Sequence, residues 1–173
     1  LMTRNTVAPG AAQAFVEQRR ARICRLLGHT PEPVGLGAAP LSADRLLHLR
    51  REAEELYWNE LVWEELTDEE AITGGGHMTE MVFPGFLAFV DGLLLEEVPA
   101  GSAHPAVPHP DAVEEILTFL GERYAEATAE LEAGADSQKV VWARLMTRHL
   151  IDLSLFRLYR LGRADQEMLE ARD

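Results

Sequence analysis

The apolar residues of this chain recur at intervals of three and four, the spacing that places side chains on one face of an α-helix. The clearest case is residues 42–72, where the stripe consists of Leu46, Leu49, Ala53, Leu56, Glu60 and Trp63. No segment shows the alternation of apolar and polar residues, rich in β-branched side chains, that is typical of strands. The pattern therefore predicts an all-α fold.

Helix-start and helix-stop signals divide the chain into elements. Gly28 ends a first helix over residues 11–27, and Ser42 caps a long second helix over residues 42–72. A third helix lies within residues 78–98, with Pro84 in its first turn and residues 78–83 as a separate turn or kink. Helices over residues 110–133 and 138–161 follow, with a short tail helix over 164–171.

These elements predict a bundle of four to five helices with a long second helix. Residues 99–110 contain four prolines and form a Pro-rich connection between the third and fourth helices. The middle of the last long helix is apolar on nearly every side, so we expect it at the centre of the bundle.

Charge is distributed unevenly along the chain. The net charge is -13, which argues against a general affinity for nucleic acid or for anionic membranes. Residues 1–40 carry five Arg against two Glu, whereas residues 41–173 carry 11 basic and 27 acidic side chains. We therefore divide the chain into a basic N-terminal helix with a Pro/Gly linker, residues 1–40, and an acidic bundle, residues 41–173. The basic segment either folds back on the bundle, contacts an acidic partner or is simply a solvated helix.

Cysteine content and hydropathy indicate a cytoplasmic protein. The only cysteine, Cys24, permits no internal disulfide, and the first residues lack the apolar core of a secretory signal. Residues 81–95 are apolar but too short to cross a membrane, and they include Pro84 and Asp91. This segment is expected to be a buried helix.

Acidic side chains occupy positions where core residues are expected. Glu60 lies on the stripe of the second helix, Asp91 lies in the apolar run FLAFVDGLLL, and His149 and Asp152 are neighbours on the face of the last long helix. If these four residues converge, they form a carboxylate/histidine site for a divalent metal. The alternative is structural pairing of each buried acid, with Arg148 as the nearest partner for Asp152.

Two further patterns bear on function. Glu52 and Glu55 resemble half of the first Glu-Glu-x-x-Glu element with which helical nucleotide pyrophosphohydrolases bind magnesium, but Ala88 stands where their later element needs an acid. Residues 150–170 resemble a short helical segment near the end of some large restriction–modification methyltransferases, with Arg160 in place of the usual small turn residue. That likeness includes nothing of their catalytic domain and implies only a shared way of ending a helix.

The sequence favours a non-catalytic module for protein–protein interaction or regulation, one that associates with its own copy and needs no cofactor. The predicted interface is the end of the second helix, where Trp58 and Trp63 are aromatic residues of the kind enriched at interfaces. The alternative is a metal-dependent helical enzyme that uses Glu60, Asp91, His149 and Asp152.

Overall fold

The computed structural model describes residues 7–61, 75–95 and 107–172. Within these ranges the chain forms seven helices and no strands: α1 (Ala11–Leu27), α2 (Ala43–Glu60), α4 (Gly75–Val82), α5 (Pro84–Leu93), α6 (Pro110–Glu132), α7 (Gln138–Leu158) and α8 (Arg163–Ala171). The all-α prediction is confirmed. The described helices exceed the predicted four to five, because Phe83 and Pro84 separate α4 from α5 and because the predicted tail helix, which the bundle count left out, forms as α8.

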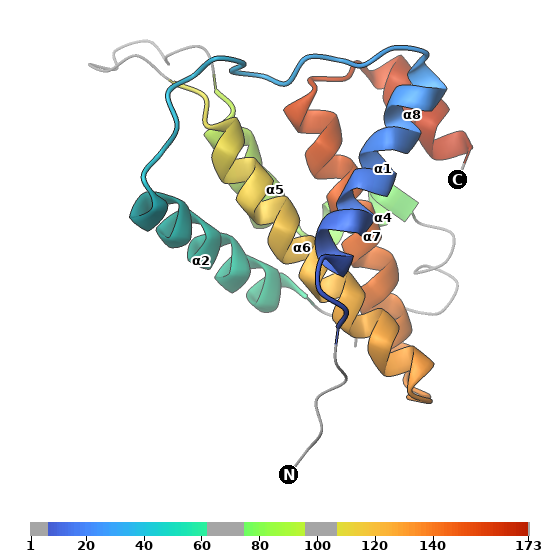
Figure 1. Cartoon of the computed structure of the whole chain (residues 1–173). Coiled ribbons are helices and arrows are strands. Elements are labelled where there is room, and N and C mark those ends of the chain that lie inside the picture. Colours follow the sequence, from blue (N-terminus) through green and yellow to red (C-terminus); the bar gives the residue numbers. More distant parts are fainter. Residues whose placement is uncertain (1–6, 62–74, 96–106, 173) are drawn as a thin grey trace.

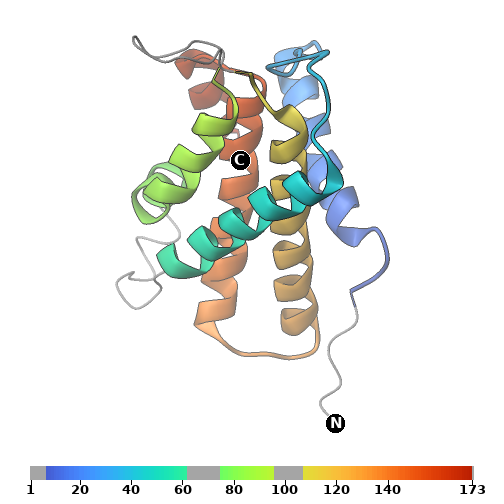
Figure 2. The same cartoon turned by 90° about the vertical axis from the view of Figure 1, so that its left-hand side faces the viewer.

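The centre of the bundle is the antiparallel pair α6 and α7 (Figures 1 and 2). Helix α1 packs on α6 and α7, α2 crosses α6 on another side, and α4 and α5 cover α7. Helix α7 is buried on nearly every side between Leu150 and Phe156, as its sequence predicts. None of the helices that the structure describes has the length and apolar character needed to cross a bilayer.

Helices α1 and α6 approach so closely that a side chain has no room between them. A Cβ atom on Gly121 of α6 would lie 2.6 Å from the carbonyl oxygen of Ala12 and 3.1 Å from a methyl group of Val16. The crossing of these helices therefore requires glycine at position 121.

Several predicted helix ends are confirmed by their caps. The Ser42 hydroxyl accepts a hydrogen bond from the Arg45 amide, and Gly28 ends α1 with a left-handed φ of 81°. Pro84 is in the first turn of α5, where its missing amide leaves no helical hydrogen bond unmade.

The long second helix is not observed as predicted. Helix α2 ends at Glu60, because the backbone of Leu61 turns to an extended conformation with ψ of 96°. At 18 residues α2 is shorter than α6, which has 23, and α7, which has 21. Residues 62–72 of the predicted helix lie outside the described residues.

Helix α7 ends at Leu158 rather than at the predicted Leu161. The cause is Arg160, whose φ of 47° lies in the left-handed region and breaks the helical repeat before α8 begins. This is the position at which the sequence places arginine where a small turn residue is usual.

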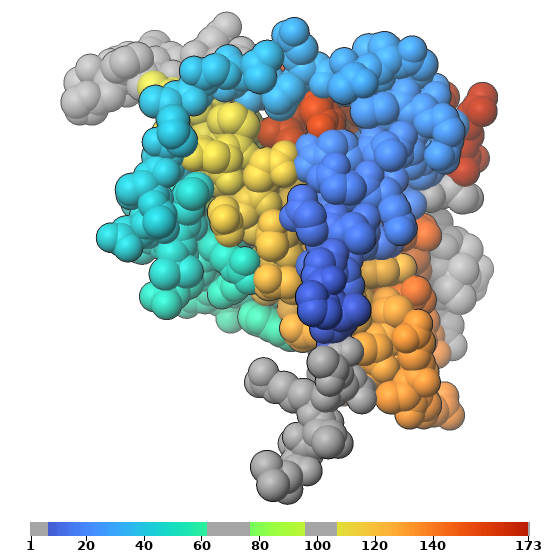
Figure 3. Space-filling model, in the orientation of Figure 1, coloured from blue at the N-terminus to red at the C-terminus, as the bar shows by residue number. Residues whose placement is uncertain are grey.

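The linker of residues 29–41 is held against the bundle. The Val34 amide donates to the Leu158 carbonyl at 2.7 Å, and the Leu41 amide donates to the Asp111 carboxylate at 2.7 Å. Between them, Gly35 has a φ of 74° and packs so closely on Pro108 that a Cβ atom there would lie 2.8 Å from its ring. Figure 3 shows this segment running along one edge of the molecule from α1 to α2.

Candidate functional site

Asp152, on α7, is the most buried of the predicted metal-ligating residues, with 5% of its surface exposed. Both of its oxygens accept hydrogen bonds from Arg19 of α1: Nε donates to Oδ1 at 2.8 Å and Nη2 donates to Oδ2 at 2.5 Å. The side chains of Arg19 and Asp152 are only 11% and 8% exposed. The fork of the guanidinium thus holds the carboxylate in a paired, structural arrangement.

His149 lies beside Asp152, as the spacing predicts. The two residues line one small cavity together with Arg22 and Leu169. Its volume of about 10 Å³ leaves no room for a ligand larger than a water molecule.

The burial predicted for Asp91 is wrong. Its side chain is 57% exposed and forms an ion pair with Arg157, whose Nε lies 2.9 Å from Oδ1. The reason is helix geometry: the buried side chains of α5 (Phe86, Leu87, Val90 and Leu93) define one face, and Asp91 lies just beyond the edge of that face, about 100° from Val90 around the helix.

Glu60, the last residue of α2, interacts with the start of α5. Its two carboxylate oxygens accept hydrogen bonds from the backbone amides of Gly85, at 2.7 Å, and Phe86, at 2.6 Å. These amides belong to the first turn of α5 and have no partner within the helix. Glu60 therefore caps α5 from another helix, and its charge is favourable beside the positive end of the helix dipole.

The four predicted ligands do not form a common metal site. Asp152 pairs with Arg19, Asp91 with Arg157, and Glu60 with the amides of α5. In the described ranges, no group of three or more His, Cys, Asp or Glu residues is arranged to hold a metal ion. Structural pairing accounts for all three acids.

We expect no rise in the melting temperature of the purified protein when Mg²⁺, Mn²⁺ or Zn²⁺ is added in excess. A metal that binds the folded state stabilises it in proportion to the logarithm of the metal concentration over Kd. Differential scanning fluorimetry with and without each ion, after treatment with a chelator, measures this. A saturable rise that Asp152→Asn removes would revive the metal hypothesis.

Arginines that pair across helices are the structural residues that the sequence interpretation did not identify. Arg20 of α1 donates to Glu114 of α6 at 2.7 Å and to the hydroxyl of Tyr159 at 2.6 Å. Burial lowers the pKa of Arg20, but these hydrogen bonds outweigh it and raise the pKa overall, so the charge is permanent. Arg50 of α2 similarly contacts Glu54 and Glu122. The basic N-terminal segment therefore folds back on the acidic bundle, one of the three predicted alternatives.

Trp58, one of the two predicted interface residues, is 48% exposed on α2, and Trp63 lies outside the described residues. The guanidinium carbon of Arg123 on α6 lies 4.5 Å from the centre of the Trp58 ring, and Tyr57 meets that ring edge-on at 5.1 Å. Tyr57 itself is buried, and its hydroxyl shares a hydrogen bond with the Thr147 hydroxyl. Burial raises the pKa of Tyr57. Trp58 is thus an exposed aromatic held in a fixed orientation.

Comparison with protein-family models, curated proteins and solved structures found no significant match for this chain.

Proposed function

We propose that this protein is a non-catalytic interaction module that self-associates in the cytoplasm through the outward face of α2. The supporting observation is a stripe of four residues on that helix, the α2 stripe: Leu47, Arg51, Glu54 and Trp58. Steps of four, three and four residues place them on one face, away from the buried Leu49, Ala53 and Tyr57.

The α2 stripe is complementary to itself. Its chemical order is apolar, basic, acidic, apolar, and reversing the helix exchanges the basic and acidic positions, so apolar residues face apolar ones and each charge faces its opposite. Two copies of α2 packed antiparallel about a two-fold axis between Arg51 and Glu54 bring Leu47 of one copy opposite Trp58 of the other. The same pairing brings Arg51 opposite Glu54. A two-fold interface requires this kind of self-complementary surface.

Exposure and charge at the stripe agree with such a contact. Leu47 and Trp58 are 46% and 48% exposed, which is unusual for large apolar side chains spaced along one helix face. Arg51 and Glu54 contribute opposite charges, and Glu54 also pairs with Arg50 at 3.0 Å, so the stripe carries no net negative charge that would make two copies of an acidic chain repel. The contact of Trp58 with Arg123 orients the ring before association, which lowers the entropy lost on binding.

Size-exclusion chromatography with light scattering on the full chain tests the proposal. At micromolar concentration we expect a dimer, and we expect Trp58→Ala to shift the protein to monomer, because a few large aromatic residues carry much of the energy of interfaces. Met81→Ala is the matched control, since Met81 is 64% exposed on α4, away from the stripe. A wild-type monomer at this concentration would end the proposal.

Charge reversal across the axis is the sharper experiment. Arg51→Glu places two acids opposite each other and Glu54→Arg places two bases opposite each other, so each single variant is expected to weaken the dimer. The double variant restores opposite charges across the axis, and we expect it to recover dimerisation. If both single variants dimerise like the wild type, α2 is not the interface. Circular dichroism melts confirm that each variant is folded.

A further inference from the structure

A histidine lies beside the α2 stripe, on the flank of the helix that is turned away from α6. His48 directly follows Leu47, and 59% of its side chain is exposed. Arg50 is about 200° around the helix from His48 and contacts Glu122 of α6, so α6 lies beyond the opposite flank. His48 therefore borders the surface on which a second copy docks.

The charged groups around His48 belong to α2 itself. Its Nε2 lies 3.0 Å from the carboxylate of Glu52, whose side chain is 46% exposed. Residues 38–42, which lead into α2, carry no charge. The other charged residues within one turn of His48 are Asp44, Arg45 and Arg51. Because a solvent-exposed pair within one helix contributes little energy, Glu52 holds His48 only weakly.

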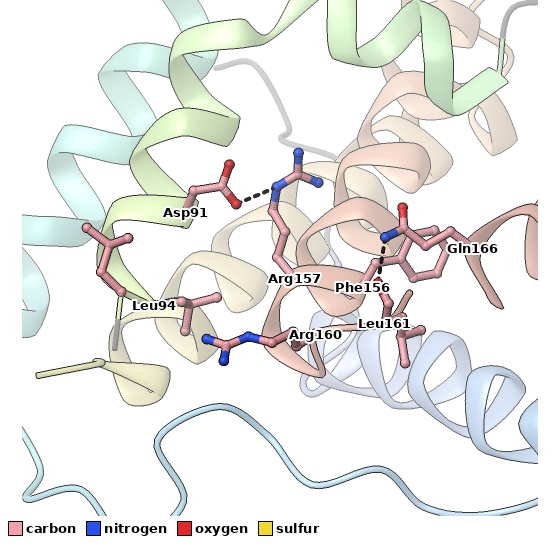
Figure 4. Close-up of a pocket in the computed structure, with 8 residues that line it drawn as sticks. Asp91, Leu94, Phe156, Arg157, Arg160, Leu161 and Gln166 are labelled. Carbon is pink, nitrogen blue, oxygen red and sulfur yellow. Dashed lines mark hydrogen bonds and ion pairs between the residues drawn. The ribbon is translucent and has the colours of Figure 1, made fainter. Parts of the chain in front are cut away.

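Glu55 is an acid on the same flank without a partner. It follows His48 by seven residues, which is about two turns, so the two side chains lie along one line of the helix. Glu55 is exposed, and its carboxylate makes no ion pair or hydrogen bond within the part of the chain that the structure describes. Asp91, also exposed, is by contrast paired with Arg157 of another helix (Figure 4). Glu55 is thus available to a second copy.

The symmetry of the proposed dimer brings His48 of one copy to Glu55 of the other; this step rests on the self-association through α2 proposed above. In an antiparallel pair the two-fold axis runs across both helices, so each flank of α2 faces the same flank of the other copy. With the axis midway between Arg51 and Glu54, Glu55 of the other copy is displaced from His48 by only about 3 Å along the helix. Both side chains span that offset, and the axis produces the contact twice.

We propose that protonation of His48 strengthens this self-association, so that mild acidification shifts the protein toward the dimer. Histidine is the side chain that ordinarily gains a charge between about pH 8 and pH 5, where exposed carboxylates remain ionised. A neutral imidazole attracts Glu55 of the other copy weakly, whereas an imidazolium faces it with the opposite charge. The added charge also reduces the repulsion between two copies of a chain whose net charge is -13.

Sedimentation equilibrium of the full chain tests the proposal at about pH 7.5 and about pH 6, where histidine is mostly neutral and mostly charged. We expect the Kd of dimerisation to fall about fivefold at the lower pH, because two symmetry-related pairs each contribute the modest energy of a surface ion pair. His48→Gln should remove most of this response. His29→Gln, which changes an exposed histidine of the linker, is the matched control and should retain it. A full response in His48→Gln would contradict the inference.

Two glutamate variants separate a contact between copies from one within α2. Glu55→Gln removes the acid that His48 meets across the interface, and Glu52→Gln removes the acid that it meets on its own helix. We expect Glu55→Gln to abolish the pH response and Glu52→Gln to keep most of it. The reverse result would assign the response to the pair within α2 and would overturn the inference.

His48→Lys supplies a permanent positive charge at the same position. We expect this variant to dimerise at about pH 7.5 as tightly as the wild type does at about pH 6, with little further change on acidification. A wild-type chain that is monomeric at both pH values would end the α2 dimer and this inference with it. A wild-type dimer whose Kd is the same at both pH values would contradict the role of His48 alone. Circular dichroism melts at each pH confirm that the variants are folded.

Discussion

Asp152→Ala is expected to lower the free energy of unfolding by about 3–5 kcal/mol, the usual result of removing one partner of a buried ion pair. Arg19 would retain its charge while only 11% of its side chain reaches water. Helix α1 buries just Val16 and Ile23, so much of its attachment to the bundle depends on such ion pairs. Chemical denaturation measures the change, and hydrogen exchange should show α1 losing protection first.

A double variant shows whether the pair itself or the isolated charge is responsible. Arg19→Met with Asp152→Leu removes both charges and keeps apolar volume, so its stability should return to within about 1 kcal/mol of wild type or exceed it. If Asp152→Ala costs less than about 1 kcal/mol, the pair is in effect solvated and α1 is held by other contacts.

Gly121→Ala is expected to destabilise the fold by about 2 kcal/mol, although alanine is the better helix former. The added Cβ would lie 2.6 Å from the carbonyl oxygen of Ala12, and because this neighbour is backbone, α1 as a whole must move. Thermal and denaturant unfolding of the variant measure the effect. The Phe15 ring, stacked on Tyr124 with centroids 3.6 Å apart, should then report a changed environment by NMR.

Gly92→Ala is the matched control. Gly92 is also in a helix, α5, and a Cβ atom there meets nothing within 4 Å. The same substitution should therefore stabilise the protein by about 0.5–1 kcal/mol through helix propensity. Equal effects at the two positions would mean that the α1–α6 crossing adjusts without penalty.

The helices were predictable because their signals are local. Gly28, Ser42 and Pro84 act within one turn of their own positions, so α1, the start of α2 and the break before α5 follow from the sequence. The end of α2 was not predictable, since Glu60 and Leu61 continue a good helical pattern. At that point the fold uses the Glu60 carboxylate to cap α5.

The environments of the candidate site residues were only partly predictable. Burial of Asp152 followed from the apolar surroundings of α7, but its partner is Arg19, 133 residues away, rather than the nearby Arg148 named from sequence. Asp91 was misplaced because the apolar run around it contains residues of both helix faces, and only packing decides which face is covered. A stripe such as that of α2 is visible in the sequence once the buried face is known.

The contacts that α1 makes with later parts of the chain also set the order in which the helices pack. Arg20 contacts Glu114, which follows it by 94 residues. Arg19 contacts Asp152, 133 residues later, and Arg22 contacts Leu169, 147 residues later. Since α1 has a thin apolar face of its own, it must wait in the nascent chain until α6, α7 and α8 have emerged. Its docking is then a late step in the folding of this chain.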